Sequence, residues 1–451
     1  MNIICLKCLD DTFIPFQKLN LDWKGDKRYP EQAIQKFITY NKEVLNFLGV
    51  SVKIDEENYV IGLRLTTSSF VGVAPLRAPA NGKYYADIEI SSRFGENVSE
   101  VAFMLKDTLE PEYLDQDIQH QSQLRAPFYF DCINYFNSFL SAIREPWNKF
   151  DVTVKVEQQP TGTTNWTKYA LNSCNPNKKL FFENRKNIQS RDHREWQELV
   201  YMLGVAINEF DSHKTPASIK LKFSDILTQL RIYYQTHRSV RRTNLFQTYT
   251  FESPRIKAVK VCANKLLQHN TANTKAWRID SAELFERYVQ YVLRLAGNIV
   301  GASVISNKRF SIRAALHPKW MLNHLEPDII LQKGDSLYFA DAKYKSHMFN
   351  TRTSTEDLKA TFRHDLHQVL AYSSFNPGKD KTSLLIYPFH NESTKSQEAK
   401  IIKLDATNPL ANVHNRIYLI GIPIVTTDLN PIVRQIAALL TEQNKEQNNV
   451  I

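Results

Sequence analysis

The chain has 451 residues, 43% hydrophobic and 23% charged, which is typical of a folded globular protein and excludes disordered, collagen-like and coiled-coil chains. This length exceeds the usual size of one domain, so we expect two or three packed units. Lys and Arg outnumber Asp and Glu by 57 to 47, and the resulting net charge of +10 favours a polyanionic partner.

Neither a membrane protein nor a secreted protein is indicated. No uncharged apolar run reaches the roughly 18 residues that cross a bilayer, and residues 1–15 lack the apolar segment of a signal peptide. The five cysteines are scattered, and Cys5 and Cys8 form a CxxC without two further close ligands, so we expect neither disulfides nor zinc. We therefore expect a cytoplasmic protein that does not contact membranes.

Residues 1–150 show the pattern of an α+β domain. An amphipathic helix is predicted from Pro30 to Leu48, with Gly49 directly after its end. Short segments of β-branched or alternating character follow, separated by turn signals, and helical periodicity returns at residues 128–143. The predicted strands are Ser51–Ile54, Tyr59–Leu65, Ser69–Val73 and Tyr84–Ile90.

Residues 151–270 are predicted to form a mainly helical middle region. Apolar residues recur at three- and four-residue spacings in Trp196–Phe210, Ile219–Tyr234 and Arg255–His269. Three arginines, Arg238, Arg241 and Arg242, lie among aromatic residues between the second and third of these segments, which makes them candidates for binding nucleic-acid phosphates. A solvated helix end and its loop would account for these arginines equally well.

Residues 271–451 are predicted to form a separate domain with a mixed sheet flanked by helices. Within it, residues 325–331 and 336–343 read as two strands joined by a turn, and so as a β-hairpin. Residues two apart in a strand share a face, so Asp341 and Lys343 project together. Asp328 lies near the open end of the partner strand, where it can approach Asp341.

Two carboxylates beside a lysine indicate a Mg²⁺ site, and Mn²⁺ is expected to substitute for Mg²⁺. Asp328, Asp341 and the carbonyl of Ala342 are candidate ligands, and Lys343 could position or deprotonate an attacking water. This is the chemistry of phosphodiester hydrolysis. If these residues stood alone, a surface hairpin whose charged groups merely pair with one another would be the default interpretation.

Two helices are expected to flank the hairpin. Asp280 and Glu283 form a capping box that explains Glu283, whereas Glu286 borders an apolar stripe and is a candidate catalytic residue and third metal-associated carboxylate. A solvated glutamate remains the alternative.

The second flanking helix is predicted from Ser354 to about Phe375, and it places Asp365, Gln368 and Tyr372 on one face. Gln368 is a candidate for orienting the attacking water or a phosphate oxygen. Alternatively, these three residues only pair buried backbone groups.

Together, these motifs resemble those of the PD-(D/E)xK nuclease superfamily, since Pro327-Asp328 precedes Asp341-Ala342-Lys343. A longer run of motifs is similar to that of McrC, the nuclease subunit of McrBC-type restriction systems, over roughly residues 279–390. It comprises LFERYV at residues 284–289, PDIIL at 327–331, DAKYK at 341–345 and DLHQVLAY at 365–372.

This resemblance implies an α+β protein whose C-terminal domain has a restriction-endonuclease-like fold and cuts double-stranded DNA. It also implies a hexameric, McrB-like AAA+ GTPase partner that activates the nuclease, and residues 1–150 are then the expected partner-binding domain. Lys345 and Tyr372, which lie within the motifs, become candidate DNA contacts. The chain has no GxxxxGK[ST] loop, so the motor is expected to be a separate protein.

Two other functions remain open at this point. The chain could be a catalytically inactive subunit that stimulates the NTPase, although a dead site has no chemical reason to keep Asp328, Asp341 and Lys343. It could also be a stand-alone nuclease that cuts without nucleotide. Cleavage assayed with and without GTP and partner separates these alternatives.

Overall fold

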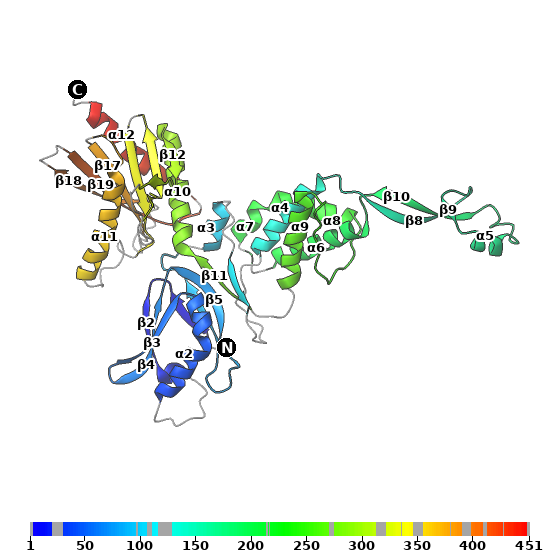
Figure 1. Ribbon diagram of the computed structural model, residues 1–451, viewed down its shortest axis with the longest axis horizontal. Coiled ribbons are helices and arrows are strands. Elements are labelled where there is room, and N and C mark those ends of the chain that lie inside the picture. The colour runs from blue at the N-terminus through cyan, green and yellow to red at the C-terminus, as the bar shows by residue number, and fades with distance from the viewer. Residues whose placement is uncertain are drawn as a thin grey trace. The chain divides into compact units, whose positions relative to one another are not determined.

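The chain forms two compact units. The first combines Met1–Ala126 with Asn273–Ile451, and the second is Pro127–Ala272, inserted in the sequence of the first (Figure 1). The computed structural model describes residues 3–19, 30–95, 98–105, 111–115, 129–212, 215, 217–269, 275–312, 322–334, 336–345, 355–378, 380–389, 398–408, 413–426 and 428–448. No helix in these ranges is long and apolar enough to cross a membrane.

The N-terminal part of the first unit contains two sheets and confirms the strands predicted there. Helix α2 (Pro30–Phe47) packs on β3 and β5, and it ends where Gly49 adopts a left-handed φ of 65°. The five-stranded sheet has the order β1-β6-β5-β11-β7, and the three-stranded sheet has the order β2-β4-β3. The bounds are β1 Ile3–Lys7, β2 Asp11–Pro15, α1 Phe16–Leu19, β3 Val50–Glu57, β4 Val60–Thr67, β5 Phe70–Arg77, β6 Tyr84–Ser91, α3 Val98–Met104, β7 Glu112–Asp115 and β11 Lys275–Asp280.

Strand β11 joins the N-terminal sheet although it directly precedes the C-terminal motifs in the sequence. It pairs antiparallel with both β5 and β7. Where β11 ends, the carboxylate of Asp280 accepts hydrogen bonds from Ser69 Oγ (3.1 Å) and from the N–H of Ala282 (2.8 Å). One residue therefore ties the sheet to the start of the next helix, α10 (Ser281–Val300), as its N-cap.

The C-terminal part of the first unit is a six-stranded mixed sheet with helices packed on it, as expected. The strand order is β12-β15-β16-β17-β19-β18. Helix α10 packs on α12 and on β12, while α11 packs on β16 and β17. The bounds are β12 Ser303–Ser306, β13 Phe310–Ser311, β14 His324–Leu325, β15 Ile329–Lys333, β16 Ser336–Ala342, α11 Thr355–Ser373, β17 Asp380–Pro388, β18 Lys400–Asn408, β19 Val413–Ile422 and α12 Asn430–Asn448.

The predicted hairpin is present, with one difference. The segment at residues 325–331 is divided between β14 and β15, because Pro327 has no N–H to donate to the strand ladder. The predicted start of the second flanking helix, Ser354, lies outside the described residues, and α11 is described from Thr355 onward.

The second unit is a group of helices from which a β-ribbon extends (Figure 1). Its helices pack through α4, which contacts α6 and α9, and through α6, which contacts α8. The ribbon pairs β8 with β10 in antiparallel register and carries β9 and α5 at its far end. The bounds are α4 Tyr129–Ile143, β8 Lys149–Glu157, β9 Thr163–Thr164, α5 Trp166–Asn172, β10 Phe182–Ser190, α6 Arg194–Phe210, α7 Ala217–Lys222, α8 Ser224–Thr236 and α9 Pro254–His269.

This organisation differs from the domain boundaries expected near residues 150 and 270. Helix α4, assigned to the N-terminal domain by its sequence position, packs with α6 and α9 because its buried aromatic face meets theirs: Phe139 stacks on Trp196, and Phe136 contacts Phe210. The region at residues 151–270 also begins with the β-ribbon rather than with helices.

Candidate active site

The hairpin of β15 and β16 brings the first two candidate residues together. Ile329 lies opposite Ala340 in the antiparallel register, so Asp328 and Asp341 are adjacent at the end of the hairpin. The carboxylate of Asp328 accepts a hydrogen bond of 2.8 Å from the N–H of Ala342. This bond fixes Asp328 beside the peptide that links Asp341 to Ala342.

Asp341 is fully buried, and the ammonium of Lys343 is its partner. Lys343 Nζ lies 2.7 Å from Asp341 Oδ2, while the Lys343 N–H donates to the carbonyl of Ile386 on β17. Apart from this ion pair of Oδ2, the carboxylate of Asp341 has no hydrogen-bond partner for Oδ1 in the described part of the chain. Buried polar atoms are nearly always paired, so the unpaired Oδ1 marks a place for a ligand.

Burial and mutual repulsion strain the two carboxylates. Burial, reinforced by the negative charge of Asp341, raises the pKa of Asp328 from 3.8 to about 8. Burial likewise raises the pKa of Asp341. Burial opposes the charge of Lys343, but the neighbouring Asp341 outweighs it and leaves the pKa of Lys343 above its usual value. A cation shared by the two carboxylates would relieve both effects.

Glu286, the third carboxylate expected at the metal, lies within electrostatic reach of the hairpin, since its charge contributes, after burial and Asp341, to the raised pKa of Asp328. In the described ranges, no group of three or more His, Cys, Asp or Glu side chains is arranged to hold a metal ion. Glu286 accepts a hydrogen bond from Gln290 (3.0 Å). Asn307, with its amide oriented to donate, bridges Glu286 Oε1 (3.2 Å) and the carbonyl of Asp328 (3.0 Å). Glu286 is thus linked to the hairpin through Asn307, which the sequence reasoning missed.

Two carboxylates and a carbonyl still suit Mg²⁺. This ion keeps several waters and is commonly held by one or two protein carboxylates together with substrate phosphates. Asp328, Asp341 and the carbonyl of Ala342 form such a set, and the unpaired Oδ1 of Asp341 supplies a free ligand atom. The residues present therefore fit the metal without Glu286.

The residues on α11 form a network behind the hairpin. Asp365 is fully buried, and its carboxylate pairs with Lys345 Nζ (2.6 Å) and accepts a hydrogen bond from Tyr387 (3.0 Å). Gln368 donates to the hydroxyl of Tyr372 (2.8 Å). The negative charges of Asp341 and Asp328 contribute, after burial, to the raised pKa of Tyr372, so this side chain lies within electrostatic reach of the hairpin.

Two candidate DNA contacts lie in this network. Tyr372 is only 5% exposed and packs in a core cluster with Ile330 and Phe339. Lys345 is engaged by the buried carboxylate of Asp365. Both residues thus help to hold α11 against the hairpin, and contact with DNA stays a prediction for them.

Tyr344, inside the DAKYK motif, joins the hairpin to the N-terminal part of the same unit. Its hydroxyl lies 3.4 Å from Cys8 Sγ, and its ring meets Phe94 edge-on with centroids 5.1 Å apart. Cys8 is buried in this contact. The second cysteine of the CxxC thus has a packing role, which the sequence alone did not reveal.

The three candidate arginines lie in the second unit. Arg242 donates to the carbonyls of Asn244 (2.6 Å) and Leu245 (2.7 Å), so it holds its own loop in place. Arg238 and Arg241 are exposed.

Comparison with family models gives a match over most of the chain. A family model described as McrBC 5-methylcytosine restriction system component matches residues 65–388. Searching the curated proteins finds no match.

Two solved structures from Thermococcus gammatolerans are similar to the chain. One is a refined half-complex from a tetradecameric assembly of McrB AAA+ hexamers with bound McrC, at 14% identity and a TM-score of 0.44, with coverage of 97% of this chain and 100% of that one. The other is the McrBC complex, at 13% identity and a TM-score of 0.30, covering 82% of this chain and 100% of that one. At these TM-scores neither likeness carries a conclusion.

Proposed function

Because the chain belongs to the McrBC 5-methylcytosine restriction system component family, we propose that it is a Mg²⁺-dependent DNA endonuclease subunit, activated by an AAA+ GTPase. The observation that carries this proposal is the fully buried Asp341, which has an unpaired Oδ1 and lies beside Asp328 and Lys343. The substrate would be double-stranded DNA, which suits the net charge of +10.

Each residue of the site has a distinct part in hydrolysis. Asp328, Asp341 and the carbonyl of Ala342 would hold Mg²⁺, which when bound polarises the phosphate and lowers the pKa of an attacking water. Lys343 places a positive charge where the phosphate gains negative charge in the transition state. The N–H of Ala342 keeps Asp328 in place.

Two further residues act around this centre. Glu286 is a positioning residue, because Asn307 connects it to the backbone carbonyl of Asp328. Gln368, held by the hydroxyl of Tyr372, would orient the attacking water or a phosphate oxygen. Both proposals predict a slower reaction, rather than a lost one, when the side chain is removed.

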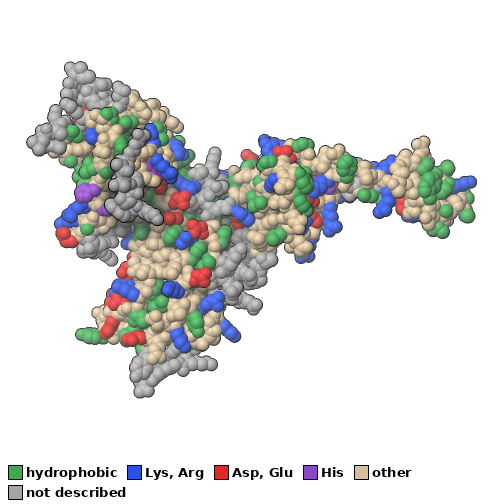
Figure 2. All heavy atoms as spheres, in the orientation of Figure 1, with side chains coloured by type: hydrophobic (Ala, Val, Ile, Leu, Met, Phe, Trp, Pro, Cys, Tyr) green, Lys and Arg blue, Asp and Glu red, His purple; other side chains and the backbone are tan. Residues whose placement is uncertain are grey.

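An exposed apolar face in the second unit supports the proposal that the chain binds a protein partner. Along β8, Phe150 is 76% exposed, and every second residue after it is an exposed valine. Hydrophobic side chains also gather at the far end of the ribbon (Figure 2). Contiguous exposed apolar surface of this kind marks binding sites for other proteins. We propose that the AAA+ partner covers it, in addition to any contact by residues 1–150.

The test is plasmid cleavage by the full chain, assayed with and without an McrB-type partner, GTP and Mg²⁺. We expect cleavage only when all are present, because the chain has no nucleotide-binding loop of its own. Cleavage with Mg²⁺ alone would show a stand-alone nuclease. Stimulated GTP hydrolysis without any DNA cleavage would show an inactive accessory subunit. Either result would overturn the proposal.

A further inference from the structure

A cavity of about 600 Å³ lies in the second unit, within this unit alone. It opens between the start of α6 and the loop that follows α8. Its lining includes Lys149, Arg194, Glu195, Glu198, Arg241 and Arg242. The volume is in the range of sites that hold small molecules, and four cationic side chains face only two carboxylates.

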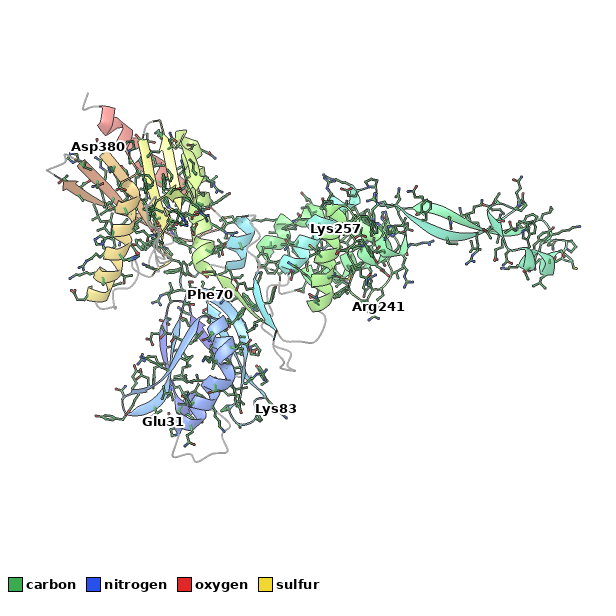
Figure 3. All side chains as sticks on the ribbon, viewed as in Figure 1. Glu31, Phe70, Lys83, Arg241, Lys257 and Asp380 are labelled. Carbon is green, nitrogen blue, oxygen red and sulfur yellow. The ribbon has the colours of Figure 1, made fainter. Side chains whose placement is uncertain are left out.

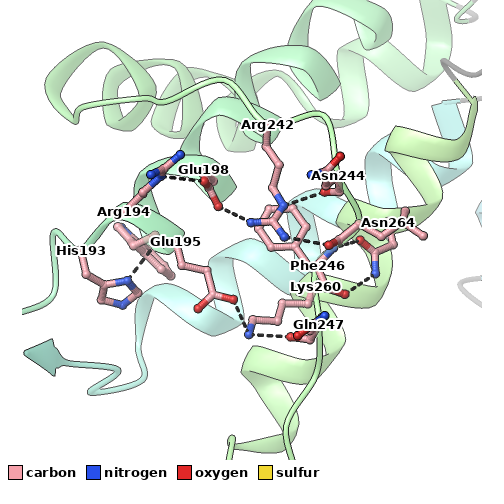
Figure 4. Close-up of polar contacts among 12 residues, drawn as sticks. His193, Arg194, Glu195, Glu198, Arg242, Asn244, Phe246, Gln247, Lys260 and Asn264 are labelled. Atoms are coloured by element: carbon pink, nitrogen blue, oxygen red, sulfur yellow. Dashed lines mark hydrogen bonds and ion pairs between the residues drawn. The ribbon is translucent and has the colours of Figure 1, made fainter.

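Side-chain contacts fix the loop that forms one wall of the cavity (Figure 4). The guanidinium of Arg242 stacks on the ring of Phe246 at 4.1 Å while donating to two carbonyls of the loop. The backbone of Phe246 is bonded in both directions by the amide of Asn264, at 2.6 and 2.9 Å. Lys260 donates to the carbonyl of Gln247 (3.0 Å). The loop therefore presents its outer side chains from a fixed backbone.

The carboxylates of the cavity are already neutralised from within. Glu195 pairs with Lys149 and with the fully buried Lys260, the latter at 2.6 Å. Glu198 pairs with Arg242 and, at 3.2 Å, with Arg194. Each carboxylate thus has two cationic partners, which offset its negative charge.

Two guanidinium groups remain directed at the opening. Arg194 is 83% exposed despite its contact with Glu198. Arg241 has no hydrogen-bond or ion-pair partner among the described residues, and its side chain extends outward from the loop (Figure 3). The hydroxyl of Thr243 and the amide of Asn244 line the same cavity and add neutral donors.

We propose that this cavity binds the phosphate group of a nucleotide, either free or within a DNA strand. Guanidinium groups bind phosphate oxygens through paired, charge-assisted hydrogen bonds, and the neutral donors serve the remaining oxygens. The cavity exceeds the size of a single phosphate and leaves room for the attached nucleoside. Arg194 and Arg241 hold the phosphate, while Arg242 and Lys260 hold the wall.

The test measures binding by the full chain in EDTA, with two probes: a short fluorescein-labelled single-stranded oligothymidylate and a labelled GTP. Arg241→Ala and Arg194→Ala should each weaken the Kd by at least about tenfold for one probe or both, because each removes a charged hydrogen-bonding group. The matched control is Arg144→Ala, an exposed arginine directly after α4 in the same unit and outside the lining, which should change the Kd by less than about twofold.

The pattern of losses identifies the source of the phosphate. If the two variants bind only the oligonucleotide more weakly, the cavity is assigned to a DNA strand. If they bind only GTP more weakly, it is assigned to a free nucleotide. The proposal is overturned if the wild type binds neither probe, if Arg241→Ala binds both as the wild type does, or if Arg144→Ala weakens binding equally. Cleavage plays no part in this measurement, so its outcome is separate from that of the endonuclease proposal.

Discussion

The surroundings of Asp341 indicate that the candidate site lowers the stability of the folded protein. A buried carboxylate with an unpaired oxygen is costly, and a second carboxylate beside it adds repulsion. The arrangement is understandable if a divalent cation and a phosphate complete it, since strain of this sort is concentrated at functional sites.

The raised pKa of Asp328 predicts how stability changes with pH in the absence of metal. Its carboxyl ionises near 3.8 in the unfolded chain and near 8 in the folded one, so the folded state binds more protons between these values. The wild type should therefore lose stability relative to Asp328→Asn as the pH rises from 4 to 8, by at most about 1.4 kcal/mol per pH unit.

Denaturant unfolding in EDTA at several pH values measures this difference. Saturating Mg²⁺ should reduce the stability difference between the wild type and Asp328→Asn at pH 8, because the metal stabilises the ionised pair. If the difference in free energy of unfolding between the two proteins stays constant across this pH range, the assigned environment of Asp328 is contradicted.

At the scale of the elements, the antiparallel pairing of β5 with β11 positions the residues that precede the active-site helix. Gly72 on β5 lies so close to β11 that a Cβ atom there would be 2.1 Å from the carbonyl oxygen of Trp277. Three residues beyond Trp277, Asp280 caps α10, the helix that carries Glu286. The close approach of the two backbones thus fixes the position of this helix.

Gly72→Ala should therefore lower the free energy of unfolding by about 2 kcal/mol or more, because the backbone of β11 must shift to admit the methyl group. Gly378→Ala is the control, since its Cβ would come no closer than 3.2 Å to a neighbouring atom. Chemical denaturation of the full chain gives both values. Equal stability of the two variants would show that β11 tolerates displacement.

The elements also show what the sequence can and cannot predict. The hairpin at Asp328 and Asp341 was predictable, because alternating apolar residues on either side of a turn are a local signal. Strand β11 was not, since its partner β5 lies about two hundred positions earlier and no local pattern identifies it. The first strand of the ribbon carries the same local signal, because apolar residues alternate from Phe150 onward, but its exposed apolar face could not be inferred, since alternation normally marks a half-buried strand.

The same limit applies to the candidate site. The residue types and their spacing predicted Asp328, Asp341 and Lys343, and the structure brings all three together. Side-chain partners follow from tertiary packing, so the sequence could not show that Asn307 intervenes between Glu286 and the hairpin. Nor could it show that Tyr372 is buried in the core.

At the scale of the whole molecule, the proposed cutting site and the proposed binding surfaces belong to different units. The first unit contains the carboxylate pair, and the second carries the apolar ribbon and the basic cavity. The proposal assigns nucleotide hydrolysis to a separate partner, because the sequence has no GxxxxGK[ST] loop.

The most direct test of the central claim is plasmid cleavage by Asp341→Asn in the complete complex with partner, GTP and Mg²⁺. We expect cleavage to fall by at least about a thousandfold, because a metal-holding oxygen is lost from the reacting centre. Binding to the partner and stimulation of GTP hydrolysis should be unchanged. Asp380→Asn, which alters an exposed aspartate at the start of β17, should cut like the wild type. Cleavage by Asp341→Asn at the wild-type rate would contradict the account.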